Sequence, residues 1–485
     1  MLEFSIYLLY RAVTALINLL PLPALFVIGQ FTGTLSWMMF PNYRRLALRN
    51  LEIAFGNEKS RSELQRLVWR HFRRLGSNLL CTVKMTAVPV ERLAARVTLE
   101  NSEPFVRLWR SGRPVVLVIS HLAMWEIFTQ VLTVLFPIGR ICGIYQTLSN
   151  RFIDQYVHAM RERSGSELFE RGPGGFQEVT TILRGGALVG ILCDQHAGDQ
   201  GVWVPFFGRL ASTTTLPALM AKRSNAIMVS CGLYTEGLAR WRMAFSMPVD
   251  ARGDSVDALT AEMNALLESE IRRSPEDWFW VHNRWKTPRP NFLLARYKRG
   301  LFLPADVPPE TLKRFRILIR ASNRLEDNNL SVPVVQAIKR GRPDAHVTVA
   351  VPSAISGAWR AVPEVDEILP LEPDRPFASA RAIRRGARFD VAVLFTNSLQ
   401  SAFEVWLAGI PLRVGYDGPY RRFFLNQLIP KRARSDRPHN PMLHYLDIAR
   451  ELGAATEDVD LKRVGLIAES PVGRTQSAPA GAIRT

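Results

Sequence analysis

A histidine directly after a strongly hydrophobic run, with a glutamate five residues further on, is the pattern in this chain best suited to chemistry. The segment VVLVISHLAMWE supplies His121 and Glu126. A carboxylate that holds one imidazole nitrogen leaves the other free to take a proton from an attacking hydroxyl. A chain with 8 histidines and 44 acidic residues supplies roughly one such pair by chance, so the position of the pair in the fold carries the argument.

The run before His121 predicts the element that positions it. Val115–Ile119 is a run of apolar residues, mostly β-branched, which is typical of a buried parallel strand. His121 then stands where the chain leaves the carboxyl end of that strand. In open α/β sheets, ligand sites form outside these carboxyl ends. We expect Glu126, in the first turns of the following helix, to reach back to the imidazole.

A second strand delivers another carboxylate. Residues 141–145 predict a strand, Asn150 is a candidate cap for a helix to about residue 164, and residues 176–184 predict a short helix. Residues 187–193 form a further apolar strand that ends at Asp194. If helical crossovers make the strands parallel, Asp194 lies at the same sheet edge as His121. Asp194 then assists His121 or holds an acceptor hydroxyl, and the alternative is a turn-forming aspartate.

The N-terminus predicts a membrane anchor. Residues 12–43 carry no charge, and two apolar segments, 4–20 and 24–40, are split by Pro21 and Pro23. Each segment would be about 26 Å long as a helix, the short limit for crossing a bilayer core. One spanning helix and a kinked hairpin in the interface both fit. A hairpin buried in a soluble core is the alternative, and the basic residues after position 43 disfavour a secretory signal.

Composition narrows the partners. The chain has 485 residues, a formal net charge of +18 and a pI near 10.3, which favours an anionic partner such as a membrane surface, a phosphorylated lipid or an acidic carrier protein. No nucleic-acid motif accompanies the charge, so no nucleic acid is expected. The four cysteines are far apart without metal-ligand spacing, which indicates reduced core residues in the cytoplasm. We expect no metal and no cofactor.

Four blocks in order carry a family resemblance: LALRNLEIAF at 46–55, HLAMWE at 121–126, DQHAGDQGVWVPFFGRLASTTTLPALMA at 194–221 and PEDWFWVHNRWK at 275–286. The segment containing them resembles the lipid A biosynthesis acyltransferases, the lauroyl and myristoyl transferases. This resemblance implies that His121 and Glu126 form a catalytic dyad and that Asp194 is the acid of the second block. It also implies a membrane anchor, an acyl carrier protein (or CoA) thioester as acyl donor, a phosphorylated glycolipid as acceptor, and the cytoplasmic face of the cell inner membrane.

Further positions are candidates for binding substrate. Arg163 matches a basic position before a glycine and suits an acceptor phosphate, with a simple helix C-terminal charge as the alternative. The other candidates are Asn150, Gln195, Arg209 and Arg284. We expect the three tryptophans at 278, 280 and 285 to line an acyl surface or to pack in the core. The family commonly has Tyr-Arg-Pro after the second strand, but this chain has Tyr145-Gln146-Thr147, which removes a cation.

The C-terminal third has a Rossmann-like rhythm of strands and helices from about residue 313. Its order resembles the N-terminal half of the ADP-heptose lipopolysaccharide heptosyltransferases, a half GT-B domain. The resemblance implies that Asp327 matches the base of the first loop, although Glu326 stands where that family prefers Gly. The second, sugar-nucleotide-binding half does not follow. We therefore expect this domain alone not to transfer sugar, and to hold acceptor or to pair with a separately encoded half.

The sequence thus predicts an α/β protein in five parts. These are a membrane anchor (1–43), an αβα acyltransferase domain (44–292), a linker (293–312), a Rossmann-like half GT-B domain (313–466) and a disordered tail (467–485). The predicted function is acyl transfer to a hydroxyl of a lipid A-like glycolipid by His/Glu general-base catalysis. The alternatives are a non-catalytic membrane adaptor that binds glycolipid, and a glycosyltransferase completed by a separately encoded half.

Overall fold

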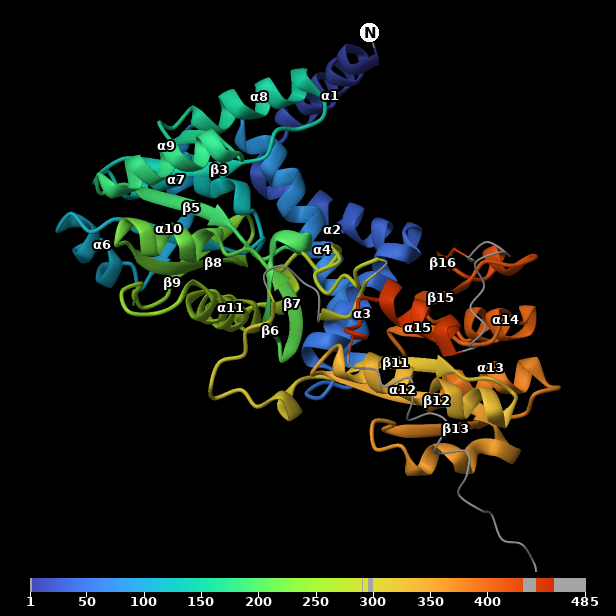
Figure 1. Ribbon diagram of the computed structural model, residues 1–485. Coiled ribbons are helices and arrows are strands. Elements are labelled where there is room, and N and C mark those ends of the chain that lie inside the picture. Colours follow the sequence, from blue (N-terminus) through green and yellow to red (C-terminus); the bar gives the residue numbers. More distant parts are fainter. Residues whose placement is uncertain (1, 290, 295–299, 431–441, 458–485) are drawn as a thin grey trace, which may run out of the picture. The chain divides into compact units, whose positions relative to one another are not determined.

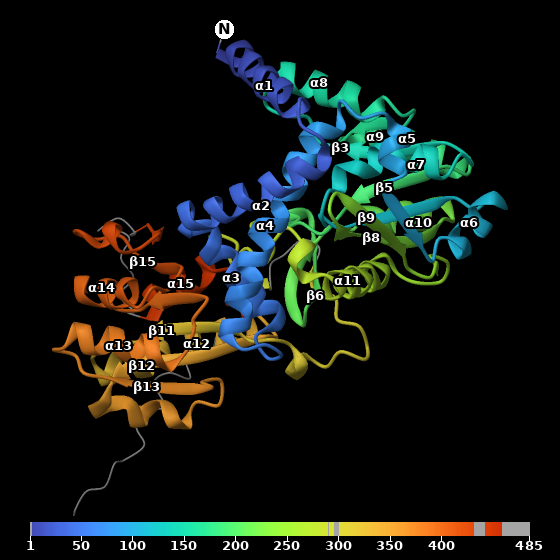
Figure 2. The same cartoon turned by 180° about the vertical axis from the view of Figure 1, so that it is seen from behind.

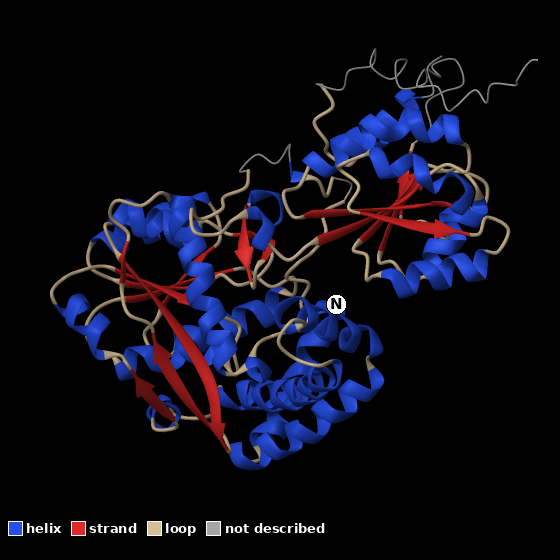
Figure 3. Ribbon diagram, turned by 90° about the horizontal axis from the view of Figure 1, so that it is seen from below, coloured by secondary structure: helices blue, strands red, loops and turns tan. Residues whose placement is uncertain are grey.

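The chain divides into two compact units in the computed structural model, which describes residues 2–289, 291–294, 300–430 and 442–457. Unit 1 comprises Met1–Lys286 and Lys298–Lys313, and unit 2 comprises Thr287–Tyr297 and Arg314–Thr485 (Figure 1). Each unit encloses its own sheet between helices (Figure 3), so the predicted α/β class is confirmed. The predicted tail, 467–485, lies outside the described residues.

Unit 1 contains helices on both sides of its main sheet. Its helices are α1 (Leu2–Asn18), α2 (Leu22–Met39), α3 (Pro41–Phe55), α4 (Arg61–Met85), α5 (Val90–Ala94), α6 (Glu103–Arg110), α7 (Phe128–Leu135), α8 (Arg151–Glu162), α9 (Pro173–Arg184), α10 (Leu216–Ser224) and α11 (Val256–Arg273). Its strands are β1 (Val97–Glu100), β2 (Val115–Ile119), β3 (Ile141–Tyr145), β4 (Glu167–Glu170), β5 (Leu188–Leu192), β6 (Val202–Phe206), β7 (Arg209–Thr213), β8 (Ile227–Gly237), β9 (Arg240–Phe245) and β10 (Val249–Asp250).

The main sheet of unit 1 has eight strands in the order β1-β9-β8-β2-β5-β3-β4, with β10 added beside β8. Strand β2 lies in the middle, is buried along its whole length, and runs parallel to both β5 and β8. Helices α10 and α11 pack against β2 and β8, and α7 packs against β3. The carboxyl ends of β2 and β5 are therefore neighbours at one edge of the sheet, as the sequence predicted.

The two N-terminal helices are partly packed on the rest of unit 1. Helix α2 lies along α4 (Figure 2), and Gly29, Gly33 and Gly76 allow their backbones to touch, since a Cβ on any of the three would meet backbone atoms of the other helix within 3.0 Å. Among the described helices, α2 is the one long and apolar enough to cross a membrane, and its opposite face exposes Phe31 (72%) and Met38 (63%).

Unit 2 is a second, fully parallel sheet covered by helices. Its strands are β11 (Phe315–Arg320), β12 (Ala345–Pro352), β13 (Glu367–Leu371), β14 (Val391–Leu394), β15 (Leu412–Tyr416) and β16 (Gln427–Ile429). Its helices are α12 (Leu325–Arg340), α13 (Pro376–Gly386), α14 (Leu399–Leu407) and α15 (Met442–Glu451). The strand order is β13-β12-β11-β14-β15-β16, so the chain reverses direction across the sheet between β11 and β14.

The segment predicted as a linker divides between the two units. Leu293 is buried in the core of unit 2, where its backbone N–H bonds to the carbonyl of Leu452. Leu301 forms a β-bridge with Trp203 of unit 1, and the Lys313 ammonium donates to carbonyls at the end of α3 in the same unit. Residues 300–313 are therefore part of unit 1 rather than a free connection.

Candidate active site

His121 and Asp194 meet at the carboxyl edge of the main sheet of unit 1. Ile119, at the end of β2, pairs with Leu192 at the end of β5, so both chains leave the sheet side by side. The His121 Nδ1 atom lies 2.6 Å from the Asp194 Oδ1 atom, and the backbone N–H of His121 donates to Oδ2 at 2.8 Å. The prediction that Asp194 shares the sheet edge with His121 is confirmed.

The surroundings of Asp194 keep it ionised. The side chain is fully buried, and the Trp278 Nε1 atom donates to Oδ2 at 2.6 Å. Burial raises the pKa of a carboxyl, but the charge and hydrogen bonds of His121 outweigh it, so the pKa of Asp194 lies well below its usual range. Burial likewise lowers the pKa of His121, and the charge and hydrogen bond of Asp194 more than offset this, so its pKa is raised. Asp194 therefore fixes the orientation of the ring and stabilises its protonated form.

Glu126 does not contact the imidazole. It lies in the 3₁₀ turn η1 (Trp125–Ile127), and its two carboxylate oxygens accept from Arg161 Nε at 2.8 Å and Nη2 at 2.6 Å. The predicted contact between Glu126 and His121 is wrong, because Asp194 occupies Nδ1 while a bidentate guanidinium occupies Glu126. Both side chains of the pair are mostly buried, with 19% and 18% exposed.

A cavity of about 360 Å³ opens beside His121. Its lining comes from the strands β2, β3, β4 and β5 and from helix α7, among other segments. The apolar lining residues are Ile119, Phe128, Leu132, Ile141, Ile144, Leu168, Ile191, Leu192 and Leu216. Ligand pockets are typically apolar clefts with a few placed polar groups, and this cavity fits an extended hydrocarbon chain.

Polar groups gather where the cavity meets His121. The Gln195 Nε2 atom lies 3.3 Å from the His121 Nε2 atom, and Glu126 and Arg161 both line the wall. His196 also lines the cavity, and burial together with nearby cations lowers its pKa to about 4, so it is neutral at pH 7. The Nε2 side of His121 therefore faces a space bordered by both polar and hydrocarbon-lined walls.

The Arg163 side chain donates hydrogen bonds to backbone carbonyls of the protein. Its guanidinium donates to the backbone oxygens of Thr86, Met85 and Val88 at 2.5, 3.2 and 2.9 Å, and to Gln130 Oε1 at 3.0 Å. These carbonyls belong to the end of α4 and the turn after it, which have no helical N–H partners of their own. These contacts favour the alternative of a structural charge at the helix C-terminus, and phosphate binding by Arg163 stays a prediction.

Three other residues predicted to bind substrate do not line the cavity. Asn150 caps α8, accepting from the N–H groups of its first turn, and its amide donates to the carbonyl of Glu3. Arg284 is fully buried, donates to Ser212 O at 2.6 Å and Thr213 Oγ1 at 2.7 Å, and does not line the cavity. Arg209, 7% exposed on β7, does not line it either. Of the five predicted binding residues, Gln195 is at the cavity.

The three tryptophans of the last block are core residues. Trp278, Trp280 and Trp285 are at most 4% exposed, and none lines the cavity. Their rings pack edge-on against one another and against Phe206. Of the two alternatives for these residues, packing in the core is the one observed, and Trp278 supports Asp194 through its indole N–H.

Arg161 is the residue that sequence reasoning missed. Arg161 and Arg163 both precede Gly165 and are two residues apart. In a helix, side chains two residues apart point about 200° away from each other. Only one of them can face the site. The 3.6-residue period gives this opposition but not which face turns inward, because that depends on how α8 packs beside α7. The structure turns Arg161 toward Glu126 and Arg163 toward α4.

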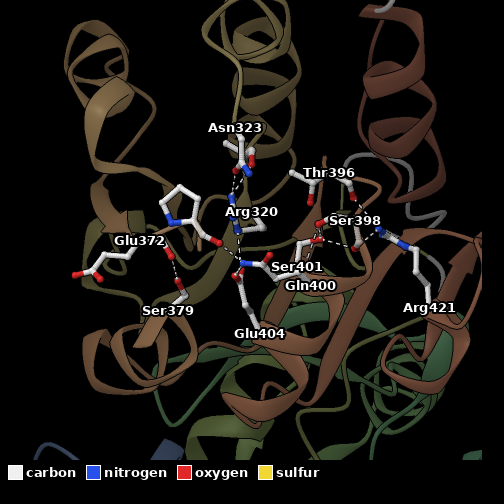
Figure 4. A network of polar contacts seen from close by, with 12 residues as sticks. Arg320, Asn323, Glu372, Ser379, Thr396, Ser398, Gln400, Ser401, Glu404 and Arg421 are labelled. Carbon is white, nitrogen blue, oxygen red and sulfur yellow. Dashed lines mark hydrogen bonds and ion pairs between the residues drawn. The ribbon is translucent and has the colours of Figure 1, made fainter. Parts of the chain in front are cut away.

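In unit 2, the carboxyl edge of the sheet is braced by a buried polar network (Figure 4). Arg320 Nε donates to Glu404 Oε2 at 3.0 Å, and its Nη1 reaches Asn323 Oδ1 at 3.2 Å. Gln400 donates to the other Glu404 oxygen. The loop after β11 is thereby fixed to α14, next to Asp327, whose Oδ2 accepts from the Ser322 hydroxyl at 2.8 Å.

Solved structures resemble part of the chain. One is the ADP-heptose lipopolysaccharide heptosyltransferase II of Escherichia coli, with 26% identity, a TM-score of 0.26, and coverage of 28% of this chain and 41% of that chain. A glycosyltransferase family 9 protein of Veillonella parvula has 18% identity, a TM-score of 0.27, and coverage of 30% and 43%. The chain thus spans less than half of each of these solved proteins.

Curated relatives match the first part of the chain. The lipid A biosynthesis lauroyltransferase of Escherichia coli is 26% identical over 282 residues, covering 57% of this chain and 90% of that protein. The lipid A biosynthesis palmitoleoyltransferase of the same organism is 24% identical over 271 residues, covering 55% and 87%. A phosphatidylinositol mannoside acyltransferase of Mycobacterium tuberculosis is 26% identical over 145 residues, covering 29% and 43%.

The sequence profile of the bacterial lipid A biosynthesis acyltransferases matches residues 1–287, which include the whole carboxyl edge with His121 and Asp194 and the cavity beside it. This match extends over more than half of the chain. The chain therefore belongs to the bacterial lipid A biosynthesis acyltransferase family and is an O-acyltransferase.

Proposed function

We propose that unit 1 transfers a fatty acyl chain from an acyl carrier protein thioester to a hydroxyl of a lipid A-type glycolipid, with His121 as general base and Asp194 as the residue that orients it. One observation carries the proposal. The imidazole is held through Nδ1 by a buried carboxylate at 2.6 Å, while the other side of the ring faces a hydrocarbon-lined cavity of about 360 Å³.

The proposed step needs no protein nucleophile. The acceptor hydroxyl gives its proton to the Nε2 atom of His121 while its oxygen attacks the thioester carbonyl, forming a tetrahedral intermediate. The C–S bond then breaks, the imidazolium returns the proton to the departing thiolate, and the ester and free thiol leave. Asp194 stabilises the imidazolium between these two events, as in the hydrolase triads, and remains ionised throughout.

We propose that Glu126 has a role other than orienting His121. Its bidentate contact holds the Arg161 guanidinium at the cavity wall, and both side chains line the cavity. We infer that Glu126 is a positioning residue for Arg161, which supplies positive charge where the anionic substrate enters.

The N-terminal helices support a membrane location. Helices α1 and α2 expose large apolar side chains, among them Leu2, Leu9, Leu16 and Leu19 on α1 or directly after it. Because α2 is packed along α4 on one face, we propose a hairpin in the membrane interface rather than a free spanning helix. The proposed location is the cytoplasmic face of the cell inner membrane, where an acyl carrier protein is available.

We also propose that unit 2 holds a sugar part of the acceptor near Asp327 and does not itself transfer sugar. The motivating observation is the position of this carboxylate beside the strand-order reversal between β11 and β14, where open parallel sheets bind ligands. Incubating the whole chain with ADP-heptose and a lipid A acceptor is expected to give no glycosylated product, and turnover contradicts the proposal.

The central test is His121→Ala, assayed by mass spectrometry of lipid A precursor incubated with acyl carrier protein thioester. Acyl transfer is expected to fall by about a thousandfold or more. His346→Ala, in unit 2, is the matched control and is expected to keep wild-type activity. Circular dichroism of both variants verifies folding. Wild-type turnover by a folded His121→Ala protein contradicts the proposed chemistry.

A further inference from the structure

Two glycines lie side by side in the floor of the cavity. Gly190 of β5 and Gly143 of β3 are partners across neighbouring parallel strands, and both line the cavity. The same row continues to Leu117 of β2 on one side and to Leu168 of β4 on the other. Cross-strand partners point to the same face of a sheet, so the row presents a leucine, two positions without side chains, and another leucine.

The backbone does not require glycine at either position. Neither Gly143 nor Gly190 has a φ in the left-handed region. A Cβ on Gly143 would meet the Leu168 Cδ2 atom at 3.0 Å, and a Cβ on Gly190 would meet the Ile119 Cδ1 atom at 3.3 Å. Both are ends of flexible side chains. Glycine weakens a strand interior and typically marks a place where another group approaches the backbone closely.

The pair lies at a defined depth below His121. Ile119 and Leu192 end their strands beside the imidazole, and Gly190 lies two residues before Leu192 in β5, which places the glycine row about 7 Å from the strand ends. Ile141, two residues before Gly143 in β3, lines the cavity beyond the glycines. A chain that enters with its carbonyl at His121 therefore crosses the glycine row before it reaches the end of the cavity.

We propose that Gly143 and Gly190 together determine the length of acyl chain that this enzyme transfers, by leaving a trough in the sheet floor through which the hydrocarbon passes. This inference rests on the proposed function, in which His121 acts on the acyl carbonyl. A side chain at either position fills the trough from below, so a long acyl chain loses its place while a short one, ending before the row, keeps its position.

The experiment compares the full chain with its Gly143→Val and Gly190→Val variants in competition assays. The donors are hexanoyl, dodecanoyl, tetradecanoyl and hexadecanoyl acyl carrier protein in equal amounts, with a lipid A precursor as acceptor and mass spectrometry as the readout. Because pocket changes of this size alter discrimination by about tenfold or more, the ratio of kcat/KM for the longest accepted donor to that for hexanoyl is expected to fall by that factor. Hexanoyl transfer, whose chain ends before the glycine row, is expected to persist.

Gly139→Ala is the matched control. Gly139 precedes β3, does not line the cavity, and its Cβ would meet Trp109 at an ordinary 3.6 Å, so an unchanged donor profile is expected. If a valine variant does not fold, the Gly143→Ala and Gly190→Ala variants take its place. The ratio of kcat/KM values is then expected to shift less, in the same direction. An equal loss for every donor, or an unchanged profile in folded variants, overturns the inference. Failure of the proposed function is separate, since it appears as full activity of His121→Ala with all four donors.

Discussion

The Asp194 carboxylate binds His121 twice, through the ring at Nδ1 and through the backbone N–H of the same residue. The double contact fixes both the position of the residue and the orientation of its ring. It follows directly from the parallel pairing of β2 and β5, whose carboxyl ends release these two side chains next to each other. A third donor, the Trp278 indole, fixes the carboxylate itself.

Asp194→Asn is expected to lower kcat by about a thousandfold while the protein remains folded, because an amide can support the wrong tautomer of His121 and does not stabilise the imidazolium. Steady-state kinetics with a single acyl donor measure the effect. Asp199→Asn, an exposed position five residues further on, is the control and should retain activity. Comparable kinetics for the two variants would show that Asp194 has no part in the reaction.

The pH profile is expected to report the raised pKa of His121. Only the neutral imidazole accepts a proton, so kcat/KM should fall as the pH drops through that pKa, with its midpoint above the ordinary value of about 6.5. Because the same shift favours the protonated folded state, the stability from this residue is present at low pH and is lost as the pH rises through its folded pKa. Measuring kcat/KM against pH checks the sign. A midpoint below the ordinary value contradicts it.

Glu126→Gln is expected to reduce the free energy of unfolding by about 2 kcal/mol, because the mostly buried Arg161 guanidinium loses a charged, bidentate partner. The acidic limb of the pH profile should move less than in a variant of Asp194, which contacts the imidazole directly. The double variant Glu126→Gln with Arg161→Gln should recover part of the lost stability. Strictly additive losses would argue against the pair acting as a unit.

Arg163→Gln is expected to affect stability rather than phosphate recognition. It removes hydrogen bonds to three backbone carbonyls at the end of α4 and in the turn after it, at a cost of about 1–3 kcal/mol. KM values for phosphorylated and dephosphorylated acceptors should change by the same factor. A selective rise in KM for the phosphorylated acceptor would instead support the phosphate-binding prediction.

Glu404→Gln is expected to loosen unit 2 locally. Arg320 and Glu404 are 3% and 0% exposed, and removing one buried charge leaves the other unpaired, at a cost of about 3–5 kcal/mol. Hydrogen exchange should accelerate in β11 and α14 and stay unchanged in β2 and β5. Glu372→Gln, whose ion pair with Arg375 is exposed, is the control and should change stability by about 1 kcal/mol at most. Equal effects of the two substitutions would contradict a structural role for the network in Figure 4.

Local sequence patterns predicted most of the elements around the site. The apolar run that forms β2, the segment that forms β3 and the Asn150 cap of α8 were all predictable, because strand runs and helix caps depend on residues close in the chain. The α12 helix is less readily predicted from local pattern, since Pro333 lies in its interior. Proline disfavours a helix interior, and tertiary packing overrides that preference here.

The sequence by itself determined the residue types, the strand ends that carry His121 and Asp194, and the family to which the first 287 residues belong. Tertiary structure decided that Asp194 and not Glu126 holds the imidazole. Glu126 is closer to His121 in the sequence, but both of its carboxylate oxygens bind Arg161. It also decided that Arg163 and Arg284 face protein carbonyls, and that two glycines meet beneath the cavity. Each of these depends on strand register and helix phase, which pair residues distant in the chain and which no local pattern specifies.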